Sequence, residues 1–279
     1  MRRSAWRFSI LFTLLFSVAV AQAVEAVPPG PAAEPWPYWE QADPENSRKI
    51  DHGAWNRFLS KYVLADHPSG IYRVRYDDVP PSDRRALKEY LDRLIAMDVR
   101  KFNRAEQRAY WINLYNASVV DMVLENPKAK NVLKIDVGFF RKGPWPVKRM
   151  TITGKWMSLD DIEHRILRSG WHDPRIHYVL NTASLGSPNM PSEAFTAENS
   201  ERLLDAAARA YVNHPRGAAV AAGRLTVSSL YLWYRDDFGG SEQGILDHLR
   251  RYATGPLKTH LAAARGIAHH AYDWNFNQP

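Results

Sequence analysis

Residues 158–191 contain an unusual density of side chains that can exchange protons or attack a carbonyl group. The candidates in this segment are Asp160, Glu163, His164, Asp173, His177, Asn181, Ser184 and Ser187. Imidazoles and carboxylates can act as general acids and bases near neutral pH. A serine becomes a nucleophile where a histidine base lies within reach of its hydroxyl. We therefore predict that the functional site of the chain lies in this segment.

The first half of the segment predicts a helix. A serine followed three residues later by an acid signals a helix start at Ser158, and Gly170 is a typical stop. Asp160, Glu163 and His164 would then share one face of the helix. A carboxylate one turn away can orient an imidazole ring and favour its charged form.

The second half predicts a strand that leads into a serine- and proline-containing loop. Residues 176–181 alternate in polarity, which places His177 and Asn181 on one side of the strand. Because the connection to the preceding helix is short, we expect His164, His177 and Asn181 to converge on one concave site beside the loop at residues 184–187. The alternative is that both histidines are structural residues with local partners.

An amide or ester hydrolase is one chemistry that these residues could support. Its candidate nucleophiles are Ser184 and Ser187, its candidate bases are His164 and His177, and its candidate orienting acids are Asp160, Glu163 and Asp173. The G-x-S-x-G elbow of many serine hydrolases is absent, and Pro188 removes a backbone N–H that an oxyanion could have used. The alternative for this loop is an ordinary Ser/Pro turn.

Metal and nucleotide chemistries find little support. His164 and His177 have no recognised ligand spacing, and no H-E-x-x-H motif occurs. Neither a G-x-G-x-x-G nor a Walker sequence is present. We therefore expect neither a metal nor a cofactor.

A long helix from Asn103 to about Leu124 must support the site. Asn103 followed by Glu106 is a capping signature, and residues 110–117 are apolar nearly all round, as in a buried central helix. Within it, Asn113 and Asn116 need polar partners. They either bind the backbone of neighbouring loops or serve as binding residues of the site.

The chain begins with a predicted signal peptide at residues 1–23. A positive start, an apolar run at residues 8–20 and an A-Q-A ending are typical of a cleaved export signal. Residues 24–47 predict a Pro/Ala-rich linker or wrapping arm. Residues 48–279 predict one domain. No second apolar run is long enough to span a bilayer, so we expect a periplasmic protein without an integral membrane segment after cleavage.

Composition narrows the possible partners. The chain has no cysteine, which excludes disulfides, thiol chemistry and a lipoprotein anchor. Its net charge is +7, and removing the three arginines of the leader lowers the charge to +4. This modest excess does not argue for nucleic acid as a partner. The ten tryptophans either form core or line a groove for a peptide or glycan.

The remaining pattern predicts an α+β fold. Hairpins are expected at residues 150–157 and around Gly223, with further strands at residues 132–140 and 267–276. The prediction is a single helix-rich domain with a mostly antiparallel sheet packed on the buried central helix.

Five motifs together resemble a bacterial and plant family called domain of unknown function 547, or DUF547. They are AYWINLYNA (109–117), IEHRILR (162–168), DPRIHYVLN (173–181), LWYRDDFG (232–239) and YDWNFN (272–277). The resemblance covers most of the chain from about residue 51 onward. It implies a fold related to the papain-like superfold.

The resemblance also implies cysteines, in a pattern like NC-x-S-x-SCP after the histidine segment. Thr182 and Ser187 stand at those positions. A thiolate is intrinsically a strong nucleophile, whereas a serine needs a well-placed base. The resemblance therefore implies a binding module or degenerate hydrolase fold with a peptide or glycan ligand. The alternative is an amide or ester hydrolase with a Ser in place of Cys, built from His177, Asn181 and the face of residues 160–164.

Overall fold

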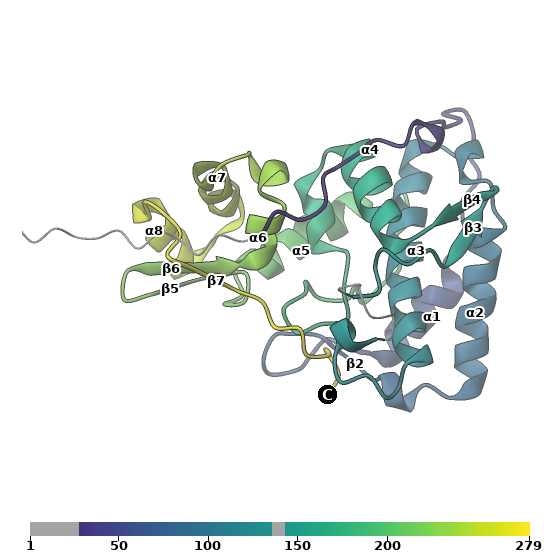
Figure 1. Ribbon diagram of the computed structural model, residues 1–279, viewed down its shortest axis with the longest axis horizontal. Coiled ribbons are helices and arrows are strands. Elements are labelled where there is room, and N and C mark those ends of the chain that lie inside the picture. The colour runs from purple at the N-terminus through teal and green to yellow at the C-terminus, as the bar shows by residue number, and fades with distance from the viewer. Residues whose placement is uncertain (1–27, 136–142) are drawn as a thin grey trace, which may run out of the picture.

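The structure is a computed structural model that describes residues 28–135 and 143–279. The predicted signal peptide, the first residues of the predicted arm and part of the strand expected at residues 132–140 lie outside the described residues. The fold is mixed α+β, with about 49% of the described residues in helices and with small sheets (Figure 1). None of the described helices is long and apolar enough to cross a membrane.

Eight α-helices are described. They are α1 (Gly53–Tyr62), α2 (Pro81–Ile95), α3 (Arg104–Glu125), α4 (Ser169–Trp171), α5 (Ser200–Val212), α6 (Ser229–Trp233), α7 (Glu242–Tyr252) and α8 (Gly255–Ala263). A π-helix, η5 (Asp161–Arg168), precedes α4 directly. The 3-10 helices nearest the site are η6 (Pro174–Tyr178) and η7 (Arg235–Phe238).

The strands of the described residues form three separate small sheets. The strands are β1 (Val63–Leu64), β2 (Arg73–Val74), β3 (Met150–Ile152), β4 (Lys155–Met157), β5 (Ala218–Ala221), β6 (Arg224–Ser228) and β7 (His269–Ala271). Three pairings are antiparallel, and β6–β7 is parallel. The expected single sheet is therefore wrong, because strands of two to five residues end before they can join across the molecule.

The predicted buried central helix is confirmed as α3. Asn103 accepts a hydrogen bond from the backbone N–H of Glu106, as the capping signature predicts. Each side chain from residue 109 to 117 is at most 1% exposed. Helices α1 and α2 lie beside α3, whereas α6–α8 and the β5–β6–β7 sheet lie at the other end of the molecule, with α5 between the two groups (Figure 1). Two hydrophobic cores result, one around α3 and one around α5–α8.

The predicted strand at residues 176–181 is wrong. The Asp173 side chain accepts a hydrogen bond from the backbone N–H of Arg175 at 2.9 Å, and Pro174 fixes the first turn. This capping starts the 3-10 helix η6. The alternating polarity did not indicate a strand, because His177 and its neighbours Ile176 and Tyr178 are all buried.

The helix expected from Ser158 to Gly170 is present but differs in its winding and its end. Its central residues form the π-helix η5, and the helix continues through Gly170 to Trp171. His172 ends it in the left-handed conformation, with a φ of 49°. π-Turns place one extra residue in the helix and often occur at functional sites.

Candidate functional site

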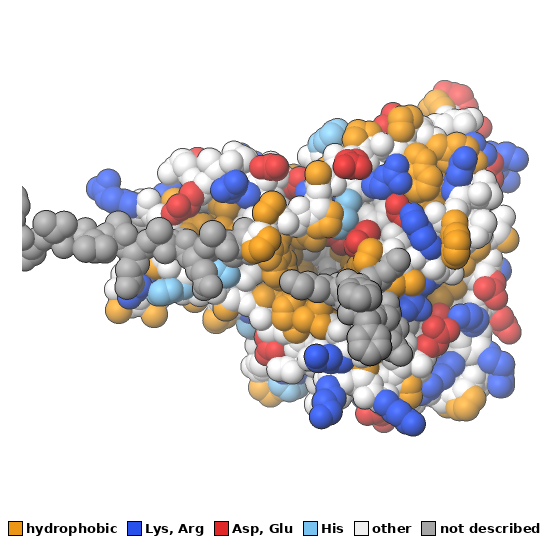
Figure 2. All heavy atoms as spheres, in the orientation of Figure 1, with side chains coloured by type: hydrophobic (Ala, Val, Ile, Leu, Met, Phe, Trp, Pro, Cys, Tyr) orange, Lys and Arg blue, Asp and Glu red, His pale blue; other side chains and the backbone are white. Residues whose placement is uncertain are grey.

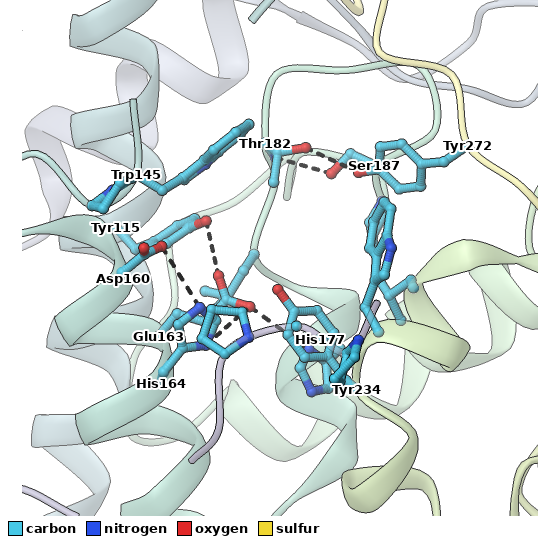
Figure 3. Close-up of a pocket in the computed structure, with 18 of the residues that line it drawn as sticks. Tyr115, Trp145, Asp160, Glu163, His164, His177, Thr182, Ser187, Tyr234 and Tyr272 are labelled. Atoms are coloured by element: carbon cyan, nitrogen blue, oxygen red, sulfur yellow. Dashed lines mark hydrogen bonds and ion pairs between the residues drawn. The ribbon is translucent and has the colours of Figure 1, made fainter. Parts of the chain in front are cut away.

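A cavity of about 370 Å³ lies between the two cores. Its walls come from residues 28–31, α3, the helix containing η5, η6, the loop after η6, the end of α6 and the C-terminal tail (Figure 3). In the face shown in Figure 2, hydrophobic side chains gather around a hollow near the middle. The cavity therefore depends on segments that are far apart in the sequence.

Aromatic rings form one continuous wall of the cavity. Trp233 contacts Tyr272 and Trp274, with ring centroids 4.9 and 5.5 Å apart. Tyr272 and Trp274 are 4.5 Å apart, and Trp145 continues the wall at 5.7 Å from Trp274. Rings packed in this way present a rigid apolar face with a few polar edges, which suits a sugar ring or the apolar parts of a peptide.

Polar groups gather at the opposite end, with Glu163 at their centre. Tyr115 donates a hydrogen bond to Oε2 of Glu163 at 3.1 Å. Oε1 of Glu163 lies 3.9 Å from Nδ1 of His164 and 3.8 Å from Nδ1 of His177. Nε2 of His164 lies 3.6 Å from a carboxylate oxygen of Asp160. One carboxylate thus faces both histidines.

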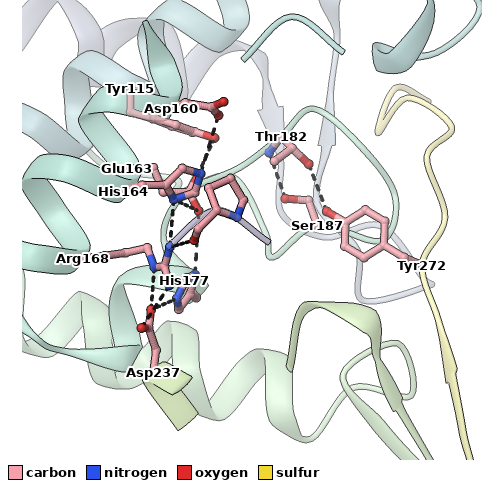
Figure 4. A network of polar contacts seen from close by, with 11 residues as sticks. Tyr115, Asp160, Glu163, His164, Arg168, His177, Thr182, Ser187, Asp237 and Tyr272 are labelled. Carbon is pink, nitrogen blue, oxygen red and sulfur yellow. Dashed lines mark hydrogen bonds and ion pairs between the residues drawn. The ribbon is translucent and has the colours of Figure 1, made fainter. Parts of the chain in front are cut away.

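His177 pairs with Asp237, and Asp237 in turn pairs with Arg168 (Figure 4). Nε2 of His177 lies 2.6 Å from Oδ2 of Asp237. Arg168 donates to both oxygens of the same carboxylate, at 2.6 and 3.1 Å. An ionised carboxylate can only accept hydrogen bonds, so His177 donates from Nε2. Its other nitrogen, Nδ1, then faces Glu163.

Arg168 also fixes the second histidine. Its Nη1 donates to Nδ1 of His164 at 3.1 Å, so His164 carries its proton on Nε2, towards Asp160. The Arg168 side chain is only 4% exposed. One buried guanidinium therefore contacts His164 directly and is linked to His177 through Asp237.

For His177 and for Asp237, burial and the neighbouring charged groups shift the pKa in opposite directions. Burial lowers the pKa of His177 and outweighs the neighbouring carboxylates that favour its charged form. Burial alone would raise the pKa of Asp237, but hydrogen bonds from His177 and Arg168 outweigh it and lower that pKa. Burial raises the pKa of Tyr115 and of Tyr272. The site therefore combines an uncharged His177 with an ionised Asp237 at neutral pH.

The loop after η6 is stabilised by its own polar side chains. Asn181 donates to the backbone oxygen of Pro188 at 2.6 Å and accepts from the backbone N–H of Ala183 at 2.8 Å. Ser187 accepts from the backbone N–H of Thr182 at 2.9 Å, and Oγ1 of Thr182 bonds the hydroxyl of Tyr272 at 3.0 Å. Within the described residues, no hydrogen bond joins a histidine to a hydroxyl of this loop.

The structure brings five of the predicted site residues to the cavity and leaves five away from it. Those that line the cavity are Asp160, Glu163, His164, His177 and Ser187. Those that do not are Asn113, Asn116, Asp173, Asn181 and Ser184. His164 and His177 therefore share one concave site beside the loop, as expected, whereas Asn181 supports the loop from inside the protein.

The two asparagines of α3 bind backbone. Asn113 donates to the carbonyl of Phe195 at 2.8 Å and accepts from its N–H at 3.0 Å. Asn116 donates to the carbonyl of Val179 and accepts from the N–H of Asn181, at 2.8 and 2.9 Å. Each amide thus satisfies one donor and one acceptor of a neighbouring loop.

Several residues that line the cavity or support its polar groups were not expected from the sequence. They are Tyr115, Arg168, Tyr234 and Asp237. Tyr234 and Asp237 belong to the LWYRDDFG motif, and Arg168 lies one helical turn after His164, so the motifs offered a signal. The described residues contain no group of three or more His, Asp or Glu side chains that could hold a metal ion.

Residues 99–212 match the model of a family described as "Protein of unknown function, DUF547". The match contains α3, η5, η6 and α5, and with them both histidines and Glu163. It confirms the expected family resemblance for residues 99–212, which hold three of the five motifs; the motifs at residues 232–239 and 272–277 lie outside the match. No curated protein and no solved structure matches the chain.

Proposed function

We propose that this chain, whose residues 99–212 form a DUF547-family domain, is a binding protein that holds a short peptide or glycan segment in the cavity. In this proposal the fold is a degenerate relative of the papain-like hydrolases. The observation that carries the proposal is the use of Thr182 and Ser187, whose polar groups hold the loop and Tyr272 rather than contact a histidine. A serine without a contacting base is a weak nucleophile.

The composition of the cavity supports ligand binding. Its aromatic wall faces a polar group formed by Glu163, Asp160 and the two histidines. Apolar cavities with a few convergent polar groups are typical of ligand sites. Because Trp145, Trp233 and Trp274 lie in the wall, a bound ligand should change their fluorescence.

A binding screen tests this proposal. The full chain is titrated with short peptides and with oligosaccharides, and tryptophan fluorescence and calorimetry are recorded. We expect at least one ligand to bind and the fluorescence change to fall in Trp233→Phe. The matched control is Trp55→Phe, whose ring is buried around α1 away from the cavity and should leave the change intact. Failure of every ligand to bind would contradict the proposal.

A hydrolase remains the second candidate, because one observation favours it. His177 is oriented by Asp237 as a catalytic base is oriented by its acid partner. In such a reaction Ser187 would give its hydroxyl proton to Nδ1 of His177 and attack an amide or ester carbonyl, and the amine or alcohol would leave with that proton. An assay with ester and amide substrates decides between the two functions. Turnover that is abolished in His177→Ala and in Ser187→Ala would favour the hydrolase, whereas absence of turnover in the wild type favours the binding protein.

We also propose that the chain is exported to the periplasm. The charged start, the apolar run and the A-Q-A ending of residues 1–23 support cleavage before Val24. N-terminal sequencing of the protein from fractionated cells should give Val24 as the first residue, in the periplasmic fraction. A chain that keeps Met1 and stays with the membrane would contradict this proposal.

A further inference from the structure

We infer that an extended free peptide containing proline and glycine binds along the side of the cavity that the chain's own residues 28–31, Pro-Pro-Gly-Pro, cover in this structure. The inference rests on the proposed ligand binding in the cavity and adds the chemistry of the ligand. These four residues are part of the cavity wall, although they precede the DUF547 match by almost 70 positions. In Figure 1 these residues begin the dark segment that runs from α6 towards α4.

The first evidence is the pairing of the backbone. The N–H of Gly30 donates to the carbonyl of Trp233 at 2.9 Å, and Nη1 of Arg168 donates to the carbonyl of Pro31 at 2.6 Å. Gly30 is the only one of the four residues that has an N–H, because the others are prolines. The cavity thus satisfies the single donor of the segment and one of its acceptors, which is how extended peptides are held.

The side chain that donates to the carbonyl of Pro31 is held in a fixed position. Arg168 is 4% exposed, and its position is fixed by two hydrogen bonds to Asp237 and one to His164. The same side chain that contacts His164 and Asp237 therefore presents a donor to the peptide carbonyl. A guanidinium held in this way loses little conformational freedom when a peptide binds.

The second evidence is the close approach at Gly30. A Cβ atom on this residue would lie 2.9 Å from Cε1 of Tyr234 and 3.3 Å from the carbonyl oxygen of Trp233. Tyr234 cannot move away easily, because its ring stacks on His177 at 4.3 Å and lies under the Arg168 guanidinium at 4.6 Å. The position opposite Tyr234 therefore selects glycine.

The third evidence is the composition of the segment. Pro28, Pro29 and Pro31 line the cavity, whose other walls carry tryptophans and tyrosines, and stay exposed to solvent at its edge. Proline-rich segments are preformed in an extended conformation and bind aromatic-lined grooves at low entropic cost. A glycan would lack the paired backbone N–H and carbonyl, so this geometry favours a peptide.

A consequence is that the chain competes with its own ligand. A free peptide must displace residues 28–31 before it can form the same hydrogen bonds. The apparent affinity is then reduced by the fraction of molecules in which the segment is released. A change that releases the segment without altering the cavity should strengthen binding of a free peptide.

The test uses a labelled peptide with the sequence VPPGPAA, which reproduces residues 27–33, and measures its fluorescence anisotropy with the full chain. Gly30→Val places a side chain against Tyr234 and releases the segment. We expect the peptide to bind Gly30→Val about tenfold or more tightly than the wild type. The matched control is Ala32→Val, a change at an exposed neighbouring residue, which should bind like the wild type.

Two further arms complete the test. A peptide with valine in place of its glycine should bind Gly30→Val at least about tenfold more weakly than VPPGPAA, because it meets Tyr234 in the same way. If the circular dichroism spectrum shows that Gly30→Val does not fold, Gly30→Ala repeats the comparison with a smaller side chain.

The outcomes separate this inference from the proposed function. Equal binding of VPPGPAA to the wild type and to Gly30→Val, or no binding to either, would overturn the inference. If other peptides or oligosaccharides still change the tryptophan fluorescence, ligand binding stands and only the ligand chemistry is wrong. If no ligand of the screen binds either protein, the proposed function fails as well.

Discussion

At the scale of single residues, the polar end of the cavity depends on Asp237. Its carboxylate pairs with Arg168 and with His177 and is itself largely buried. Asp237→Asn would leave the buried guanidinium of Arg168 without a counter-charge. We expect the free energy of unfolding to fall by about 3 kcal/mol, as for other broken buried ion pairs.

Urea unfolding at pH 7 measures this loss. The control is Asp236→Asn, which removes the same charge from an exposed neighbouring position and should change the stability by less than about 0.5 kcal/mol. Similar stabilities of the two variants would show that the Arg168–Asp237–His177 contacts contribute little.

The Asp237 carboxylate should make the free energy of unfolding depend on pH in the acidic range. The pKa of Asp237 is lowered in the folded protein, so its carboxylate stabilises the fold at pH values above the unfolded aspartate pKa of about 4. This stabilisation is lost as the pH falls from that value towards the pKa of the folded state. We expect the wild type to lose more free energy of unfolding than Asp237→Asn between pH 5 and pH 3. Parallel curves for the two proteins would refute the assignment.

At the scale of elements, α3 positions two loops through its buried amides. Asn116→Ala would leave the carbonyl of Val179 and the N–H of Asn181 without partners inside the protein. Each buried unsatisfied group costs about 1–3 kcal/mol, so we expect a loss of about 2 kcal/mol or more. Thermal and urea unfolding measure it.

The control for this change lies on the same helix. Ser118 is partly exposed, and alanine is a good helix former, so Ser118→Ala should change the free energy of unfolding by less than about 0.5 kcal/mol. An Asn116→Ala protein as stable as Ser118→Ala would mean that the loop carrying Asn181 does not depend on α3.

At the scale of the whole molecule, buried histidines should make the protein sensitive to mild acid. Burial lowers the pKa of His52 and of His248 to about 4. The unfolded chain takes up these protons near pH 6.5, whereas the folded chain does so only near pH 4. Their contribution is therefore present above pH 6.5 and is lost as the pH falls towards 4.

Each histidine could account for roughly 3 kcal/mol of this loss. We expect His248→Gln, which can still bond the hydroxyl of Tyr178, to lose less stability than the wild type between pH 7 and pH 4.5. His269→Gln, at an exposed position, should keep the dependence of the wild type. An unchanged pH dependence in His248→Gln would contradict the prediction.

The position of the cavity also depends on the packing of the whole molecule. The Trp145 and Trp274 rings pack on the core around α3, whereas Trp233 and Tyr234 pack on the core around α5–α8. The cavity lies where the two cores meet, so its shape depends on how both are packed. No single segment of the chain contains enough of its wall to predict it.

The sequence by itself determined the features that depend on neighbouring residues. The cap at Asn103 predicted the start of α3, and the apolar residues 110–117 predicted its burial, because both signals act within a turn or along one helix. The two hairpins followed from their turn residues. The one-face spacing of Asp160, Glu163 and His164 likewise placed them together at the cavity.

The tertiary structure alone decided the features that depend on distant partners. His177 meets Asp237, 60 positions later, and Gly30 meets Trp233, more than 200 positions later. Alternation at residues 176–181 predicted a strand, but the cap at Asp173 and burial on all sides favoured a 3-10 helix. Local sequence patterns determine which backbone conformations have a low free energy. Which buried polar groups find partners is settled only when the two cores pack together.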